Sequence, residues 1–443
     1  MQVKEKEGTM KRLALIAGLL VLMVAGLAQA KTTVEFWHAM SGSRLKVLEK
    51  IVSDFNAAHP DVEVRAVFTG TYEETLTRFI AGYRTGTAPH LVQVYEVGTQ
   101  TMIDSGAIIP VYQIPEMLGE TWDWAQYVRP IVLYYSVDGD LWPYPFSSST
   151  FMLYYNKDHL RQAGLDPNKP PTTWAEVEEY GEQLIQAGVV TNVLSFGWPD
   201  CIFEQELALH NYLYADNENG RADLSTRVTW PDAFSVKLFE TWTRLSQKGI
   251  FLYGGPEYDA NAAFTAGKIS MLLQSTSSLD GILKTALGKF EVGTSFLPRF
   301  ADEPSGNSVI GGSSLWVRKG QSEAELRAVW EFLKYLSQTD VAIYWHKGTG
   351  YFPTTNAALK QLMDEGWFVE SPNHLTAFLQ ILSGRQDTAA ALGARLGPFP
   401  EIRDYIRTAI EKACAGTLSP EEALAEAAAK ANRALEEYRS LIK

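Results

Sequence analysis

Apolar positions after Lys31 alternate between a strand-like and a helix-like period. The alternation predicts a strand, a helix, a strand, a helix and a strand, at 33–37, 43–60, 62–68, 72–86 and 90–95. This order indicates a parallel sheet of the α/β class with right-handed crossovers. Because ligands of such sheets bind beyond the carboxyl ends of the strands, the loops that follow these strands are the first places to look for a site.

A stretch rich in β-forming residues follows at 140–158. The pattern then predicts helices at 172–188, 230–249 and 258–268, and strands at 193–198, 269–278, 290–298 and 308–320. Thr173 is a plausible N-cap of the first of these helices. From Ser322 onward the chain is mostly helical. The last helix starts at Ser419–Pro420, and its alanine-rich body fits either a docked terminal helix or a partner helix.

The chain has 443 residues, of which 46% are hydrophobic, so it is long and apolar enough for two domains with real cores. We find neither an internal repeat nor a long flexible linker, which indicates that the chain crosses between two lobes more than once. The net charge is −13, and the sequence contains no basic stripe of the kind that binds nucleic acid, so nucleic acid is not an expected partner. Twelve Trp and twenty Tyr supply faces suited to small polar ligands.

The N-terminus has the features of a secretory signal peptide. Lys11 and Arg12 precede an apolar run that ends at Ala28-Gln29-Ala30, and the run is short for a membrane anchor, which is the alternative interpretation. We expect cleavage near Ala30 and a periplasmic protein. No cysteine follows the cleavage site, so no lipoprotein anchor is expected. Cys201 and Cys414 are the two cysteines, and the sequence leaves open whether they form a disulfide or are buried separately.

Motifs of catalysis and cofactor binding are missing from the sequence. It contains no glycine-rich phosphate loop, nucleotide-binding fingerprint, nucleophile elbow or metalloprotease motif, and its seven His are scattered. We therefore expect no cofactor, no metal and no enzymatic activity. The predicted strand ends collect aromatic residues, hydroxyls, an acid and an arginine instead, which is typical of a site that binds a polar small molecule.

Several strings together resemble one family: FWHAMSGS, GTYEETLTRFIAGYRTG, PFSSSTFMLYYNKD, IGGSSLWV, HKGTGYFPTT and ARLGPFPEIR. The chain resembles the periplasmic glycerol-3-phosphate-binding proteins, the solute receptors of ABC importers. The resemblance implies two α/β lobes joined by a hinge, with the ligand bound between them. The chain would cross the hinge near Thr150, Ser308 and Tyr351. It implies lobes at 31–149 plus 308–350 and at 150–307 plus 351–443, and a monomer that delivers its ligand to a membrane permease.

The resemblance also implies the ligand contacts. Tyr72 and Glu96 would hold the glycerol hydroxyls, because a carboxylate accepts two hydroxyl donors at once. The phosphate would be held by Ser149, Ser275, the backbone N–H of Gly312, Tyr351 and Arg395. Trp198 would form a wall that could also face a trimethylammonium group. The secondary candidates are Trp37, His38, Ser148 and His210.

The chain departs from the family pattern near that wall. Pro199-Asp200-Cys201 stands where a second tryptophan is expected, and His210 replaces a further aromatic residue. These departures leave open whether the ligand is the phosphate monoester or a diester such as glycerophosphocholine. Two alternatives remain: a receptor for oligosaccharides of the maltose or trehalose type, and an exported glycerophosphodiesterase or other hydrolase.

Overall fold

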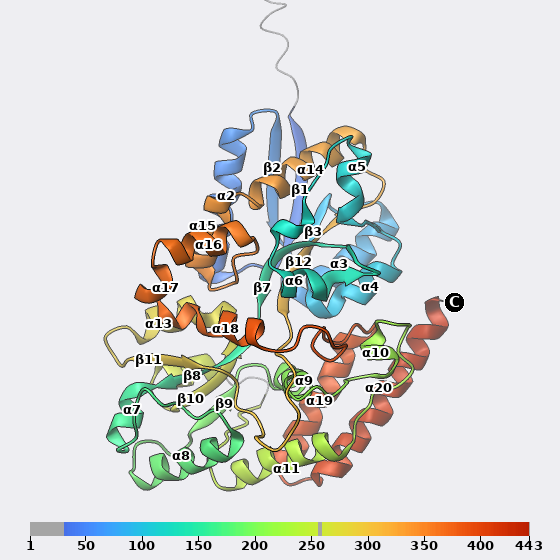
Figure 1. The fold of residues 1–443 in the computed structure, drawn as a ribbon. Coiled ribbons are helices and arrows are strands. Elements are labelled where there is room, and N and C mark those ends of the chain that lie inside the picture. The colour runs from blue at the N-terminus through green and yellow to red at the C-terminus, as the bar shows by residue number, and fades with distance from the viewer. Residues whose placement is uncertain (1–30, 256–258, 443) are drawn as a thin grey trace, which may run out of the picture.

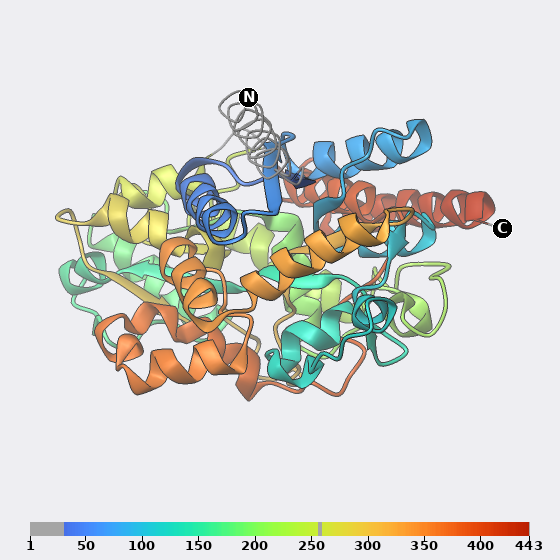
Figure 2. The same cartoon turned by 90° about the horizontal axis from the view of Figure 1, so that it is seen from above.

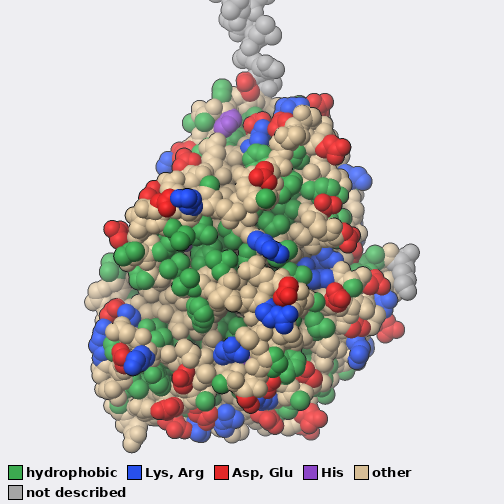
Figure 3. Space-filling model, in the orientation of Figure 1, with side chains coloured by type: hydrophobic (Ala, Val, Ile, Leu, Met, Phe, Trp, Pro, Cys, Tyr) green, Lys and Arg blue, Asp and Glu red, His purple; other side chains and the backbone are tan. Residues whose placement is uncertain are grey.

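The computed structural model describes residues 31–255 and 259–442, and the predicted signal peptide lies outside the described residues. Two separate sheets organise these residues into an upper and a lower lobe (Figure 1). No helix in residues 31–255 and 259–442 is long and apolar enough to cross a membrane. On the face that Figure 3 draws, acidic and basic side chains are interspersed.

The upper sheet has the strand order β2-β1-β3-β12-β4, with β7 also paired to β12. Its strands are β1 Thr32–His38, β2 Val62–Phe68, β3 Leu91–Tyr95, β4 Ile108–Ile109, β7 Tyr144–Ser149 and β12 Gly311–Arg318. β1 pairs in parallel with both β2 and β3, as the sequence pattern predicts. β12 lies much later in the chain than the other strands of this sheet and runs antiparallel to β3, β4 and β7.

Helices cover this sheet on both faces. They are α2 Gly42–Ala58, α3 Tyr72–Thr85, α4 Thr99–Asp104, α5 Ile114–Met117, α6 Arg129–Tyr135, α14 Glu323–Leu336 and α15 Thr339–Thr349, and α16 Asn356–Asp364 packs against α15. α3 begins at a capping box of Thr71 and Glu74, and Gly86 ends it in the left-handed conformation, as predicted. A small hairpin, β5 Ser136–Val137 and β6 Asp140–Leu141, lies beside α6.

The lower sheet has the order β11-β8-β10-β9. Its strands are β8 Phe151–Asn156, β9 Leu194–Phe196, β10 Met271–Ser275 and β11 Val292–Ser295. The helices of this part of the chain are α7 Lys157–Gln162, α8 Trp174–Gln186, α9 Pro199–Leu209, α10 Asp216–Gly220, α11 Ala233–Gln247, α12 Ala260–Thr265, α13 Leu279–Ala286, α17 Trp367–Glu370, α18 Thr376–Ser383, α19 Phe399–Cys414 and α20 Pro420–Ile442. Thr173 caps α8 as predicted, in a capping box with Glu176.

The predicted strand at 193–198 is too long. β9 ends at Phe196 because Trp198 is the N-cap of α9 and Pro199 is the first residue of that helix, a position that favours proline. The predicted strand at 308–320 likewise begins only at Gly311.

The chain passes directly from one sheet to the other at Thr150. β7 of the upper sheet ends at Ser149, and β8 of the lower sheet begins at Phe151. Apolar packing continues across this passage, because one buried cluster contains both Phe36 of β1 and Leu272 of β10. The lobes are therefore joined by buried, regularly paired chain rather than by a flexible linker.

The C-terminal helix α20 is a docked helix, which settles the alternative that the sequence left open. It packs against α19 and α11 at the edge of the lower lobe, and Figure 2 shows its C-terminal end at the right of the molecule. Its inward face is alanine-rich and includes the fully buried Leu424. Of the two alternatives that the sequence left open for the cysteines, the structure has separate residues: Cys201 and Cys414 are both free thiols. Burial raises the pKa of Cys414 to about 12.

Leu424→Ala tests the docking of α20. Leu424 is 0% exposed, so its truncation is expected to lower the free energy of unfolding by about 2–5 kcal/mol. Leu441→Ala is the matched control on the same helix, because Leu441 is 84% exposed, and its effect should stay within about 0.5 kcal/mol. Urea denaturation of both variants measures the difference. Equal effects at the two positions would contradict the docked arrangement.

Candidate ligand-binding site

The passage between the lobes brings several predicted ligand residues together. β7 and β12 pair with Ser149 opposite Gly311 and with Ser148 opposite Gly312. The register shifts between Ser313 and Ser314, which marks an irregularity in the pairing close to the passage. The pairing thus makes Gly312 a neighbour of Ser148 and Ser149, although its motif lies far from theirs along the chain.

Gly312 has a conformation that other residues adopt only with strain. Its φ is +95°, and an added Cβ would lie 1.9 Å from the carbonyl oxygen of Ser147 and 3.2 Å from Oγ of Ser149. A side chain at this position would therefore collide with β7. Glycine here allows two backbones to approach closely beside the Ser149 hydroxyl.

Two further segments converge on the same place. Ser275 is the last residue of β10 and pairs with Phe151, and the N–H of Thr276 donates to the carbonyl of Thr150 over 2.9 Å. A Cβ on Gly350 would lie 2.5 Å from the carbonyl oxygen of Thr276. The N–H of Phe352 donates to the carbonyl of Ser148 over 2.8 Å. These contacts bracket Tyr351 and hold it beside both serine-rich segments.

Two buried hydroxyls in this region have no protein partner. Oγ of Ser148 and Oγ1 of Thr276 are buried and make no hydrogen bond within the described residues. An unsatisfied buried polar atom costs about 1–3 kcal/mol, and a polar ligand bound here would satisfy both hydroxyls. The donor set of hydroxyls and close-packed backbone suits an anion with several oxygen atoms.

Tyr351 connects this region to the first helix of the upper lobe. Its hydroxyl lies 3.2 Å from the hydroxyl of Tyr72, the first residue of α3. Nη1 of Arg44 donates to the same Tyr351 hydroxyl over 3.5 Å. Tyr351 is stacked on Trp345, and Tyr72 is stacked on Tyr95. Aromatic packing therefore fixes both tyrosine hydroxyls in place.

Glu96 forms a charged contact between the lobes. It follows β3 directly, is 8% exposed, and accepts a hydrogen bond from Nη2 of Arg403 on α19 over 2.7 Å. The Arg403 guanidinium also pairs with Glu204, and Asp200 lies within 3.9 Å. Burial raises the pKa of Glu204 to about 7, and the charge of Arg403 opposes that rise. Arg403 thus holds Glu96 through one carboxylate oxygen.

Arg395 occupies a different position between the lobes. Its guanidinium donates to the carbonyls of Ser136 over 3.5 Å and Arg221 over 3.4 Å, and its buried Nε has no partner within the described residues. No carboxylate of the described residues forms an ion pair with Arg395, and burial lowers its pKa. Within residues 31–255 and 259–442, the Arg395 side chain makes no hydrogen bond with Glu96, Ser149 or Gly312.

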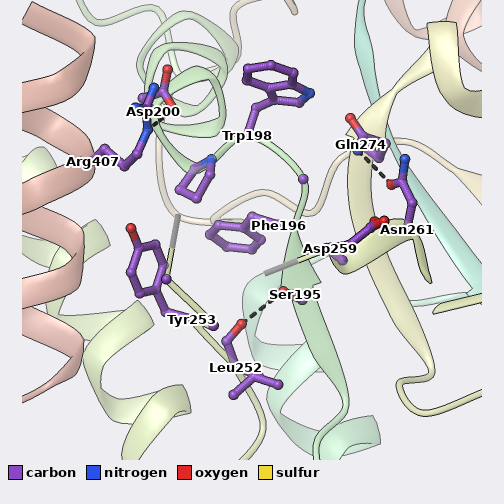
Figure 4. Close-up of a pocket in the computed structure, with 15 residues that line it drawn as sticks. Ser195, Phe196, Trp198, Asp200, Leu252, Tyr253, Asp259, Asn261, Gln274 and Arg407 are labelled. Atoms are coloured by element: carbon purple, nitrogen blue, oxygen red, sulfur yellow. Dashed lines mark hydrogen bonds and ion pairs between the residues drawn. The ribbon is translucent and has the colours of Figure 1, made fainter. Parts of the chain in front are cut away.

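Trp198 is one of the residues that line a cavity of about 460 Å³ in the lower lobe (Figure 4). The cavity lies at the ends of β9 and β10, and its lining includes Phe196, Asp200, Asp259 and Arg407. Trp198 is 52% exposed, so its ring face is available to a ligand. Arg407 pairs with Asp200, which also approaches Arg403. Ion pairs through Asp200 therefore link the lining of the cavity to the charged contact at Glu96.

The remaining secondary candidates lie elsewhere. Nδ1 of the buried His38 accepts a hydrogen bond from the N–H of Met40, and burial lowers the pKa of His38 to about 4. Trp37 lines a surface groove with Val67 and Phe68, on a different side of β1 from His38. His210 is fully buried in the lower lobe, where its Nε2 accepts from the N–H of Phe300 over 2.9 Å. These residues make local structural contacts.

Arg44, Arg403 and Glu204 are functional candidates that reasoning from the sequence did not single out. Arg403 stands in the string ARLGPFPEIR, but its direction depends on the docking of α19, which no local pattern reveals. Arg44 follows the glycine-serine loop after β1, where the rule for strand ends points. Within residues 31–255 and 259–442, no cluster of His, Cys, Asp and Glu is arranged to hold a metal ion.

Comparison with known proteins identifies the family. The model of the bacterial extracellular solute-binding proteins matches residues 50–376. The chain belongs to this family. It is 36% identical to the sn-glycerol-3-phosphate-binding periplasmic protein UgpB of Escherichia coli (strain K12) over 436 residues, which cover 97% of this chain and 99% of that protein. The Salmonella typhimurium protein of the same name is 36% identical over 95% of this chain and 96% of its own length.

Solved structures confirm the fold of this solute-binding protein. UgpB from Mycobacterium tuberculosis in complex with glycerophosphocholine superimposes with a TM-score of 0.76 at 21% identity, covering 92% of this chain and 99% of that one. The cyclic alpha-maltosyl-1,6-maltose binding protein from Arthrobacter globiformis gives a TM-score of 0.73 at 20% identity, over 92% and 100% of the two chains. The predicted two-lobed α/β fold is thereby confirmed.

Gly312→Ala tests the packing at the passage between the lobes. The added methyl group would collide with Ser147 in a left-handed backbone, so the variant should lose about 2 kcal/mol or more of unfolding free energy. Gly311→Ala is the control, because its Cβ would lie 3.6 Å from Oγ of Ser149, an ordinary contact, and its φ is not positive. Urea denaturation compares the two. A harmless Gly312→Ala would refute the close approach of β7 and β12.

Buried Glu206 predicts a dependence of stability on pH. Its Oε2 accepts from Nε1 of Trp174 over 3.1 Å, and burial raises its pKa from 4.5 to about 8. Because the folded state then holds the proton more tightly, this stabilisation is complete below about pH 4.5 and disappears as the pH rises through about 8. His210, with a pKa of about 4, stays neutral above about pH 6.5.

We expect the wild-type protein to lose about 1–2 kcal/mol more unfolding free energy between about pH 6.5 and about pH 8 than Glu206→Gln does. Glutamine keeps an acceptor for Trp174 and removes the titration. Urea denaturation at the two pH values measures the difference, and identical pH dependence in both proteins would contradict the raised pKa.

Proposed function

We propose that this solute-binding protein is the receptor of an ABC importer that captures sn-glycerol 3-phosphate and glycerophosphodiesters such as glycerophosphocholine. The observation that carries the proposal is the convergence of Ser149, Ser275, Gly312 and Tyr351 from four separate chain segments at the passage between the lobes. The UgpB relatives, whose names state sn-glycerol 3-phosphate binding, support this ligand class.

The roles proposed for the residues follow the chemistry of the ligand. The serine hydroxyls and the Gly312 backbone receive phosphate oxygens, together with Tyr351 and the cationic Arg395. Tyr72 and Glu96 receive the glycerol hydroxyls, with Glu96 using the oxygen that Arg403 does not hold. Trp198 forms the wall next to the cavity of the lower lobe.

The proposed mechanism is closure of the two lobes on the ligand. We propose lobes at 31–149 plus 308–350 and at 150–307 plus 351–443. A ligand that contacts both lobes binds the closed state better and shifts the population toward it, and the membrane permease recognises that state. We propose a monomeric, periplasmic binding protein that uses no cofactor and catalyses no reaction.

An oligosaccharide ligand is the second candidate, and the exposed Trp198 favours it. A tryptophan face that is 52% exposed beside a 460 Å³ cavity suits stacking on a sugar ring. Isothermal titration calorimetry with sn-glycerol 3-phosphate, glycerophosphocholine and maltose distinguishes the two candidates. We expect micromolar or tighter binding of a glycerophosphate and no heat with maltose. The reverse result would replace the proposed function by the oligosaccharide receptor.

Arg395→Ala tests the proposed cation of the phosphate site. Removal of a guanidinium that pairs with phosphate is expected to lower the affinity for sn-glycerol 3-phosphate at least about tenfold. Arg403→Ala is expected to lower it to a similar extent, because Glu96 and Glu204 then lose their common partner. Arg385→Ala, at an exposed ion pair with Asp387, is the control. Unchanged affinity in Arg395→Ala, with a loss in Arg403→Ala, would assign the cation to Arg403.

A further inference from the structure

Arg44 is a partly buried cation at the ligand-binding region that no carboxylate neutralises. It lies in the first turn of α2, directly after the loop that follows β1, and that turn contains no acidic residue. No ion pair in residues 31–255 and 259–442 includes it, whereas Arg403 has Glu96, Glu204 and Asp200 within 4.0 Å. Arg44 therefore contributes a net positive charge to its surroundings.

Arg44 lies near the hydroxyls of Tyr351 and Tyr72, both of which have proposed ligand roles. Its Nη1 is 3.5 Å from the Tyr351 hydroxyl, which in turn lies 3.2 Å from the Tyr72 hydroxyl. Tyr351 is 1% exposed and stacked on Trp345, with an angle of 1° between the rings. The tyrosine that we assign to the phosphate thus has a guanidinium within hydrogen-bonding distance of its hydroxyl.

The charge of the ligand determines what such a cation does. A phosphate monoester carries between about 1.5 and 2 negative charges near neutral pH, whereas a phosphodiester carries one. The attraction to a fixed guanidinium grows in proportion to that charge, and a trimethylammonium head group is repelled by it. One additional cation therefore distinguishes the two ligand classes by their charge rather than by their size.

We propose that Arg44 is a specificity-determining residue that selects phosphate monoesters such as sn-glycerol 3-phosphate over phosphodiesters such as glycerophosphocholine. The proposal rests on the proposed function, since it assumes a glycerophosphate between the lobes. The Tyr351 hydroxyl transmits the effect by hydrogen-bonding to Arg44 on one side and to the phosphate on the other.

The test is the ratio of the dissociation constants for glycerophosphocholine and sn-glycerol 3-phosphate, measured by calorimetry for each variant. Arg44→Gln should weaken the monoester about tenfold and the diester no more than about threefold, so that the ratio falls. Arg44→Lys keeps the charge and should keep a ratio close to that of the wild-type protein. Lys46→Gln removes an exposed cation two residues along α2 and should leave the ratio unchanged.

An unchanged ratio in Arg44→Gln would overturn the proposal, and so would equal losses for both ligands, which a merely structural role produces. A ratio in Arg44→Lys as low as in Arg44→Gln would also overturn it, because charge would then not be the cause. A wild-type protein that binds neither ligand would refute the proposed function instead. Circular dichroism confirms that each variant is folded before its ratio is used.

Discussion

The pairing of β12 with β7 is the constraint on which the rest of the structure depends. β7 leads into the lower lobe at Thr150, and β12 re-enters the upper sheet at Gly311, so both passages lie side by side. The positive φ of Gly312 permits this approach, which no larger residue fits. The same pairing fixes Ser148 and Ser149, and through Phe352 it also fixes Tyr351. In the proposed account, the hinge and the ligand-binding surface are therefore built from the same pair of strands.

Charge organises the region around this pairing. Arg403 joins Glu96 of the upper lobe to Glu204 of the lower lobe, so the charges of these two buried acids are compensated. Arg44 and Arg395 lack carboxylate partners within the described residues, so each contributes uncompensated positive charge to this region. A protein with a net charge of −13 can thus hold an anion, because local placement of arginines outweighs the overall charge at short range.

The sequence predicts the architecture of this protein better than its site. Helix and strand periods locate α2, α3, β2 and α8 to within two residues, because amphipathic spacing and capping residues such as Thr173 are local signals. The resemblance to a family supplied Ser149, Ser275, Gly312 and Tyr351, which no local signal connects. The sequence did not single out Arg44 and Arg403, because the directions of their side chains depend on tertiary packing. Tertiary packing also buries His210, which the sequence offered as a ligand candidate.

The central claim is that a glycerophosphate binds where the two lobes meet. A crystal structure of the protein grown with sn-glycerol 3-phosphate tests it most directly. The account predicts phosphate oxygens at Ser149, Ser275 and the Gly312 backbone, with the glycerol hydroxyls at Glu96. A ligand bound only in the cavity beside Trp198, or in the surface groove of Trp37 and Phe68, would contradict it.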